Sequence, residues 1–169
     1  MEPREFIQLQ LAAARRQSDA VLNAITSEQF NWMPPGTCNS ISATFIHMLA
    51  SEDRAFQATL QGKPRIWETD GWGEKIGLQE TPGGGQNWEQ VKGKNLTLLS
   101  LLGYEQSVRT ATDAYLAQFT SQELDRKITV NGHERLAADV ISGTVLHIML
   151  HTGEIAAIKG MLGIKGLPG

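Results

Sequence analysis

The sequence predicts an all-α fold, a four-helix bundle in which a long crossover joins the second and third helices. Two observations in its 169 residues carry this prediction. Apolar residues recur at helical spacing in four long segments, and a glycine-rich stretch at 61–87 separates the second segment from the third. A connection of that length allows the two helices beside it to run parallel, which a short loop does not allow.

The first two helices are indicated by their apolar stripes and by their start signals. Pro3 suits a first helical turn, where its missing N–H costs nothing, and apolar positions then follow at 7–25 with helical spacing. Asn39 or Ser40 can cap a second helix, because a short polar side chain accepts from the free N–H groups of the first turn. This second helix is expected to reach about Leu60.

The last two helices are predicted at about 88–119 and 137–162, the latter capped by Gly163. The intervening residues 129–133 contain Asn-Gly, which is typical of a tight turn and allows a short β-hairpin before the last helix. The four helices together are predicted to form a single domain over residues 1–169.

The connection at 61–87 has an unusual composition. It holds seven of the 17 glycines and two prolines, together with Trp67 and Trp72, and Trp88 stands at its edge. Connections this long are commonly lids or binding loops. The tryptophans either line a substrate pocket or cover the open end of the bundle, and the sequence favours neither. We expect the segment to form a lid or wall over the functional site.

Composition excludes several classes of protein. The formal charge of −3 argues against binding to nucleic acid, whose affinity depends on Lys and Arg. No apolar run approaches the about 18 residues of a membrane span, and the N-terminal residues lack the pattern of a secretory signal. The one cysteine, Cys38, cannot form an internal disulfide and is expected to be a small packed residue. These features predict a cytoplasmic protein.

Three of the four histidines are candidate metal ligands. His147 and His151 are four residues apart, so both project from one face of the last helix, on a row that we expect to face the interior. His47 lies in the middle of the second helix, with small neighbours around it. Three neutral imidazoles with an open coordination position suit a catalytic divalent ion. The alternative is that each is a hydrogen-bonded core residue without metal.

Other candidate residues have weaker support. Glu154 continues the histidine row by one turn and could be a fourth ligand, could orient a histidine, or could bond a backbone group or Arg54. Arg54 is a candidate for the surroundings of the site. His133 is expected to be exposed in its turn. The last-helix pair lacks the adjacent glutamate of zincin proteases, and the Glu-x-x-His pairs of di-iron bundles are absent.

The order and spacing of these motifs resemble those of the DinB-like superfamily of metal-binding four-helix bundles. The likeness is carried by 37–42 leading to His47-Met48-Leu49, by 146–155 around the histidine pair, and by the tail at 162–169. It implies a divalent metal, often nickel or zinc, held by His47, His147 and His151, and frequent homodimers.

The resemblance implies a reaction class less firmly than it implies the metal site. Characterised relatives include transferases and isomerases that use low-molecular-weight thiols. The sequence itself contains no Gly-x-Ser-x-Gly nucleophile motif. We therefore expect a thiol-dependent transferase acting on a small electrophile. The alternatives are a metal-dependent hydrolase and a non-catalytic metal-binding protein of the stress response.

Overall fold

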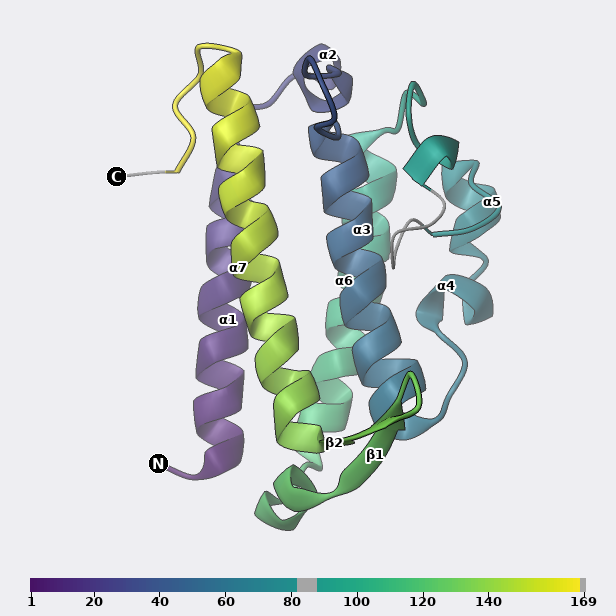
Figure 1. Ribbon diagram of the computed structural model, residues 1–169, viewed down its shortest axis with the longest axis vertical. Coiled ribbons are helices and arrows are strands. Elements are labelled where there is room, and N and C mark those ends of the chain that lie inside the picture. Colours follow the sequence, from purple (N-terminus) through teal and green to yellow (C-terminus); the bar gives the residue numbers. More distant parts are fainter. Residues whose placement is uncertain (82–87, 168–169) are drawn as a thin grey trace.

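The computed structural model describes residues 1–81 and 88–167, and most of them are helical. Four helices lie side by side in Figure 1, namely α1 (Pro3–Leu22), α3 (Ile41–Asp53), α6 (Leu98–Ala117) and α7 (Ala137–Met161). α1 packs against α7, and α3 packs against both α7 and α6. The part of the predicted lid at 82–87 and the end of the tail at 168–169 lie outside the described residues.

The first predicted helix is shorter in the structure and is followed by a second, short one. α1 ends at Leu22, and Ala24 adopts a positive φ of 57° that breaks the helix. α2 (Ser27–Asn31) then begins at a cap that we did not predict, in which Thr26 Oγ1 accepts a hydrogen bond from Gln29 N. The apolar positions at 7–25 predict one continuous helix, and this prediction is wrong at its C-terminal end, because α1 stops at Leu22.

α3 begins at Ile41, directly after Ser40, one of the two predicted capping residues. Ser40 Oγ accepts a hydrogen bond from Ala43 N at 3.2 Å, which satisfies one of the free donors of the first turn. The helix continues without a break into the π-helix η1 (Arg54–Thr59). A π-helix is wider than an α-helix and is rare, and such segments are frequent at functional sites. Nothing in the sequence signals this change of winding.

The described part of the long connection is structured rather than loop-like. It contains α4 (Ile66–Thr69) and α5 (Trp72–Ile76), and after the gap come the 3₁₀ turn η2 (Trp88–Gln90) and α6. The predicted start of the third helix at Trp88 is wrong, because α6 begins only at Leu98. The chain turns at Gly93 with a φ of 70°, a conformation that glycine adopts without strain.

Asp53 fastens this connection to the long helices. Its buried carboxylate accepts from the backbone N–H groups of Ile66 and Trp67, each at 2.9 Å, and from the hydroxyl of Tyr104 at 2.7 Å. Three donors compensate for much of the cost of burying that charge. The start of α4 is thereby held against α3 and α6.

Hydrogen bonds between helix ends define how the chain runs. The Asn31 side chain donates to Leu96 O near the start of α6, whereas Arg4 near the start of α1 donates to Ala117 O at the end of α6. Arg126 donates to Leu60 O just beyond η1. α3 and α6 therefore run in the same direction, away from α2 (Figure 1).

A β-hairpin precedes α7, as Asn-Gly allowed. After the 3₁₀ turn η3 (Ser121–Asp125), β1 (Lys127–Val130) pairs antiparallel with β2 (His133–Leu136). The two residues between them, Asn131 and Gly132, have φ of 51° and 78°. Positive φ at both positions is the pattern of the type I′ turn that joins two twisted strands.

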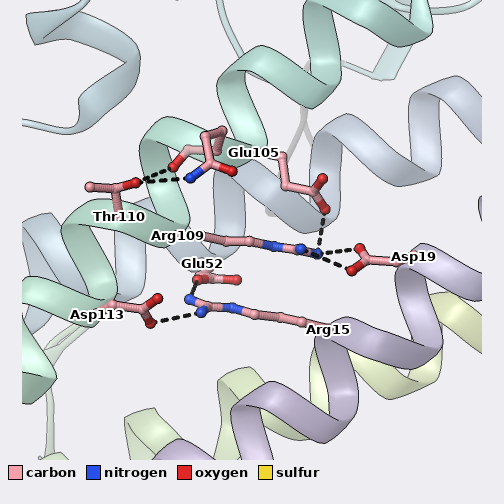
Figure 2. Close-up of polar contacts among 8 residues, drawn as sticks. Arg15, Asp19, Glu52, Glu105, Arg109, Thr110 and Asp113 are labelled. Atoms are coloured by element: carbon pink, nitrogen blue, oxygen red, sulfur yellow. Dashed lines mark hydrogen bonds and ion pairs between the residues drawn. The ribbon is translucent and has the colours of Figure 1, made fainter.

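The interior between α1, α3 and α6 contains charged residues as well as apolar ones. Figure 2 shows two arginines that each bridge two carboxylates. Arg15 pairs with Glu52 and Asp113, and Arg109 pairs with Asp19 and Glu105. Of these six side chains, Arg15, Glu52 and Glu105 are buried. Nothing in the sequence marks these three as interior residues.

α7 has a composition that also occurs in membrane spans. Within the described ranges it is the helix that is long and apolar enough to cross a membrane. Core helices of soluble proteins meet the same criterion, and α7 packs along α1 and α3.

Candidate metal centre

Two antiparallel helices bring three imidazoles to one point. His147 and His151 project from the same face of α7, one turn apart, and His47 projects toward them from α3. Nε2 of His147 lies 3.1 Å from Nε2 of His47 and 3.1 Å from Nε2 of His151. One ligand atom from each of the three residues fits within 4.8 Å of the others. The structure therefore brings together the three histidines that the sequence analysis selected.

The centre lies at the edge of the core rather than in its middle. His47 is buried, and His147 and His151 are half-buried. Their row on α7 also includes Thr144 and Ile158, both of which are buried. The predicted interior row is therefore present, with its histidine portion open enough for a small molecule to approach.

His147 is held in its neutral form. Burial and, to a smaller extent, repulsion from the charged forms of the neighbouring His151 and His47 together lower the pKa of its imidazole to about 4. A histidine must be neutral to bind a metal ion. At neutral pH this side chain can therefore act as a ligand without first releasing a proton.

Glu154 orients His151. The Nδ1–H of His151 donates to Glu154 Oε2 at 2.8 Å, and this hydrogen bond is the main reason that the pKa of Glu154 is lowered. A carboxylate on the far nitrogen of a histidine fixes its tautomer and makes the facing nitrogen a better ligand. Of the roles considered for Glu154, the structure favours orientation of a histidine, and Glu154 pairs with His151 rather than with Arg54.

The hydrogens of the three rings are difficult to place without a cation. Because His151 carries its hydrogen on Nδ1, its Nε2 presents a lone pair to His147. A hydrogen on His147 Nε2 could point at only one of its two neighbours. A hydrogen on His147 Nδ1 would be buried with no hydrogen-bond partner among the residues described.

A divalent ion accepts all three Nε2 lone pairs at once and so satisfies both Nε2 contacts of His147, with the hydrogen of that ring on Nδ1, which has no partner among the described residues. Two nitrogens bound to one ion at about 2.0–2.1 Å lie roughly 3 Å apart, and the two separations of 3.1 Å agree with this. The residues present therefore fit a three-histidine metal site. The donor set of imidazoles suits zinc, nickel, copper or iron better than magnesium or calcium.

The tryptophans of the long connection separate into two groups. The ring of Trp88 lies against His47, with 4.7 Å between the ring centroids. The rings of Trp67 and Trp72 instead pack on Tyr104 of α6, at 5.4 and 5.9 Å. Trp88 is therefore the tryptophan that forms a wall of the metal centre, and the sequence held no signal that distinguished it from the other two.

A pocket of about 240 Å³ adjoins the metal centre on the His147 side. His147 forms part of its lining, and Arg54 of η1 forms another part. The remaining lining comes from α3, η1, the hairpin and the start of α7: Ser51, Ala55, Thr59, Val130, Asp139, Val140, Gly143 and Thr144. Beyond the histidine row, Arg54 is the one residue of this lining that the sequence indicates, because the others come together only when η1 packs beside α7.

The two remaining candidates lie outside the centre. His133 is exposed on the hairpin, as predicted. Cys38 is exposed in the segment before α3, so the expectation that it is a packed residue is wrong. It precedes the cap Ser40, at a position where no neighbouring element covers its side chain.

Two solved structures share the fold of this chain. A conserved protein from Enterococcus faecalis superposes with a TM-score of 0.81 at 20% identity, over 96% of this chain and 99% of that one. A DinB-like protein from Bacillus subtilis superposes with a TM-score of 0.64 at 16% identity, over 96% of each chain. At these identities the likeness shows the fold alone. A search of curated proteins finds no match.

The family is shown by the sequence itself. The profile of the DinB superfamily matches residues 10–155, which include all three histidines of the centre. With its DinB-like helical fold, the chain belongs to the DinB superfamily.

Proposed function

We propose that this protein is a divalent-metal-dependent transferase that joins a small thiol to a small electrophile at the three-histidine centre. The observation that carries the proposal is the convergence of three Nε2 atoms, one of them oriented by Glu154, beside a pocket of about 240 Å³. A divalent ion held there would lower the pKa of a bound thiol, so that the thiol loses its proton at neutral pH.

The chain's own residues have three tasks in this reaction. His151 and Glu154 form a fixed pair, so the site needs little rearrangement when the thiol enters. The ring of Trp88 beside His47 provides an apolar wall for the electrophile. The metal centre, with the pocket on its His147 side and Trp88 on its His47 side, holds thiol and electrophile close together, which replaces a bimolecular encounter by a reaction between neighbours.

The reaction needs no nucleophile from the protein. The thiol loses its proton to solvent, its sulfur forms the new bond to the electrophilic carbon, and the leaving group departs with the bonding electron pair. Cys38 lies exposed before α3 and is absent from the pocket lining. A reaction through an external thiol is therefore favoured over one through a protein thiolate.

Further properties belong to the same proposal. We propose zinc or nickel as the native metal, a cytoplasmic location and a four-helix bundle as the scaffold.

We also propose a homodimer formed through α1 and α7, where Phe6, Leu146 and Leu150 are 53%, 59% and 63% exposed. Large apolar side chains that are exposed together mark interaction surfaces. Sedimentation velocity tests the dimer, and Leu150→Asp should yield a monomer.

The central experiment measures turnover of 1-chloro-2,4-dinitrobenzene by the protein loaded with zinc or nickel, with and without 2-mercaptoethanol. We expect turnover that requires both metal and thiol, survives in Cys38→Ser and is lost in His151→Ala. His133→Ala is the matched control, because it removes an exposed histidine of the hairpin.

Two results would contradict the transferase. Hydrolysis of 4-nitrophenyl acetate that depends on metal but not on thiol would favour a hydrolase. Stoichiometric metal binding without either activity would favour a non-catalytic metal-binding protein.

A further inference from the structure

The pocket beside His147 has one cationic side chain in its lining, Arg54. Arg54 is the first residue of η1, directly after the buried Asp53. The wide π-helical turn begins at this residue. Arg54 and Ser51 together form the α3 side of the pocket, and Gly143 and Thr144 of α7 lie across from them.

The guanidinium of Arg54 has no protein partner in the described part of the chain. No hydrogen bond or ion pair joins it to another described residue, whereas Arg15, Arg65 and Arg109 all pair with carboxylates. Asp139 lines the same pocket, but its Oδ2 accepts a hydrogen bond from Leu136 N at the start of α7. The guanidinium donors of Arg54, which is exposed, are therefore available to a ligand bound in the pocket that it lines.

Arg54 and His147 line the same pocket, so one small ligand can reach both of them. The surroundings add little negative charge, since Asp139 is the one acidic residue in the lining.

Arginine recognises one chemistry especially well. Its planar guanidinium donates two parallel hydrogen bonds to a carboxylate, with more geometric specificity than a lysine provides. A volume of about 240 Å³ limits the ligand to a small molecule. A molecule that places its sulfur at the metal centre beside His147 and its carboxylate at Arg54 would use both the metal centre and the one cationic residue of this lining.

We propose that Arg54 binds the carboxylate of the thiol substrate, so that the substrate class is a small carboxylate-bearing thiol rather than a neutral one. This inference rests on the proposed function, because it assigns the second anchoring point of the same thiol. Arg54 is a binding residue here, and the metal is held without it.

The test measures binding by isothermal titration calorimetry to the zinc-loaded protein. The probes are mercaptoacetate and 2-mercaptoethanol, two thiols of similar size of which only the first carries a carboxylate. We expect Arg54→Gln to weaken mercaptoacetate about 10-fold or more, the loss typical of hydrogen bonds to a charged group. Affinity for 2-mercaptoethanol and bound zinc per chain should not change.

Two variants provide controls. Arg54→Lys should recover part of the affinity, because it keeps the charge but not the fork of donors. Arg16→Gln removes another exposed arginine, on α1 and outside this pocket, and should leave both affinities at the wild-type value.

The outcomes distinguish this inference from the proposed function. Equal weakening of both thiols in Arg54→Gln, an unchanged affinity for mercaptoacetate, or no binding of mercaptoacetate to the wild type would overturn the carboxylate assignment. Inorganic phosphate that binds more tightly than mercaptoacetate with the same dependence on Arg54 would also overturn it. If glycolate, which has no sulfur, binds as tightly as mercaptoacetate and depends on Arg54, the carboxylate site stands and the thiol function fails.

Discussion

Glu105 is a buried carboxyl whose replacement tests the charged cluster between α1 and α6. Its side chain is 7% exposed and accepts a hydrogen bond from Arg109 (Figure 2). Its pKa is raised from an ordinary value of 4.5 to about 7, because desolvation by burial, aided by repulsion from Asp19, outweighs the attraction of the Arg109 guanidinium. Glu105→Gln keeps the shape of the side chain and removes its titration.

The expected effect follows from proton linkage. Between pH 4.5 and 7 the folded protein holds a proton on Glu105 that the unfolded chain has released, so the free energy of unfolding falls as pH rises. One pKa unit corresponds to about 1.4 kcal/mol, so the whole shift amounts to about 3 kcal/mol. This stability is fully present below pH 4.5 and is lost once the pH has passed about 7.

The assay is urea unfolding of metal-free protein, followed by circular dichroism from pH 4 to 8. The wild-type curve alone is not sufficient, because the lowered pKa of His147 makes stability rise with pH between about 4 and 6.5. The difference between Glu105→Gln and wild type isolates Glu105. The difference in free energy of unfolding between the two proteins should shift by about 3 kcal/mol in favour of the glutamine variant as pH rises across this range.

A matched control is Glu134→Gln, which removes an exposed carboxylate that pairs with Lys127 on the hairpin. Exposed ion pairs contribute little to stability, so its difference from wild type should not vary with pH. A difference between Glu105→Gln and wild type that is constant from pH 4 to 8 would refute the reasoning.

Three further predictions concern the metal centre and the packing of the long connection. His147→Ala should sharply lower bound metal per chain by elemental analysis, and His133→Ala should not; equal metal content in both would contradict the three-histidine site. Glu154→Gln should weaken metal affinity about 10- to 100-fold in a chelator competition, since His151 loses its orienting carboxylate; an unchanged affinity would show that this pair is not needed. Gly103→Ala would place its Cβ 2.7 Å from the ring of Trp72, so urea unfolding should show a loss of about 1–3 kcal/mol, and wild-type stability would contradict that close contact.

Local chemistry made much of the fold predictable from the sequence. The start of α3 depends on the hydroxyl of Ser40 and the first N–H groups of its own helix, all within a few residues. The hairpin depends on Asn131 and Gly132, which tolerate positive φ. Such interactions depend on neighbours in the sequence, so a reader of the sequence can find them. The failures at Ala24 and Leu98 are errors of helix boundaries, which depend on where the chain must turn to pack.

The same reasoning applies to the metal centre. The spacing of His147 and His151 places both on one face of α7 by helical geometry alone. His47, the proposed third ligand, also lies within residues 10–155, the range that the profile of the DinB superfamily matches. The separations of 3.1 Å between Nε2 atoms depend on how α3 packs against α7, and no local rule provides them.

The sequence by itself determined the helical class, the start of α3, the hairpin and the three histidines, because each follows from periodicity or from a contact between near neighbours. Only the tertiary structure decided that Trp88 rather than Trp72 contacts His47, that Arg54 shares a pocket with His147, and that Glu105 is buried. These features join residues far apart in the chain. Their burial and charge environment arise from the packing of whole helices, which sequence spacing does not encode.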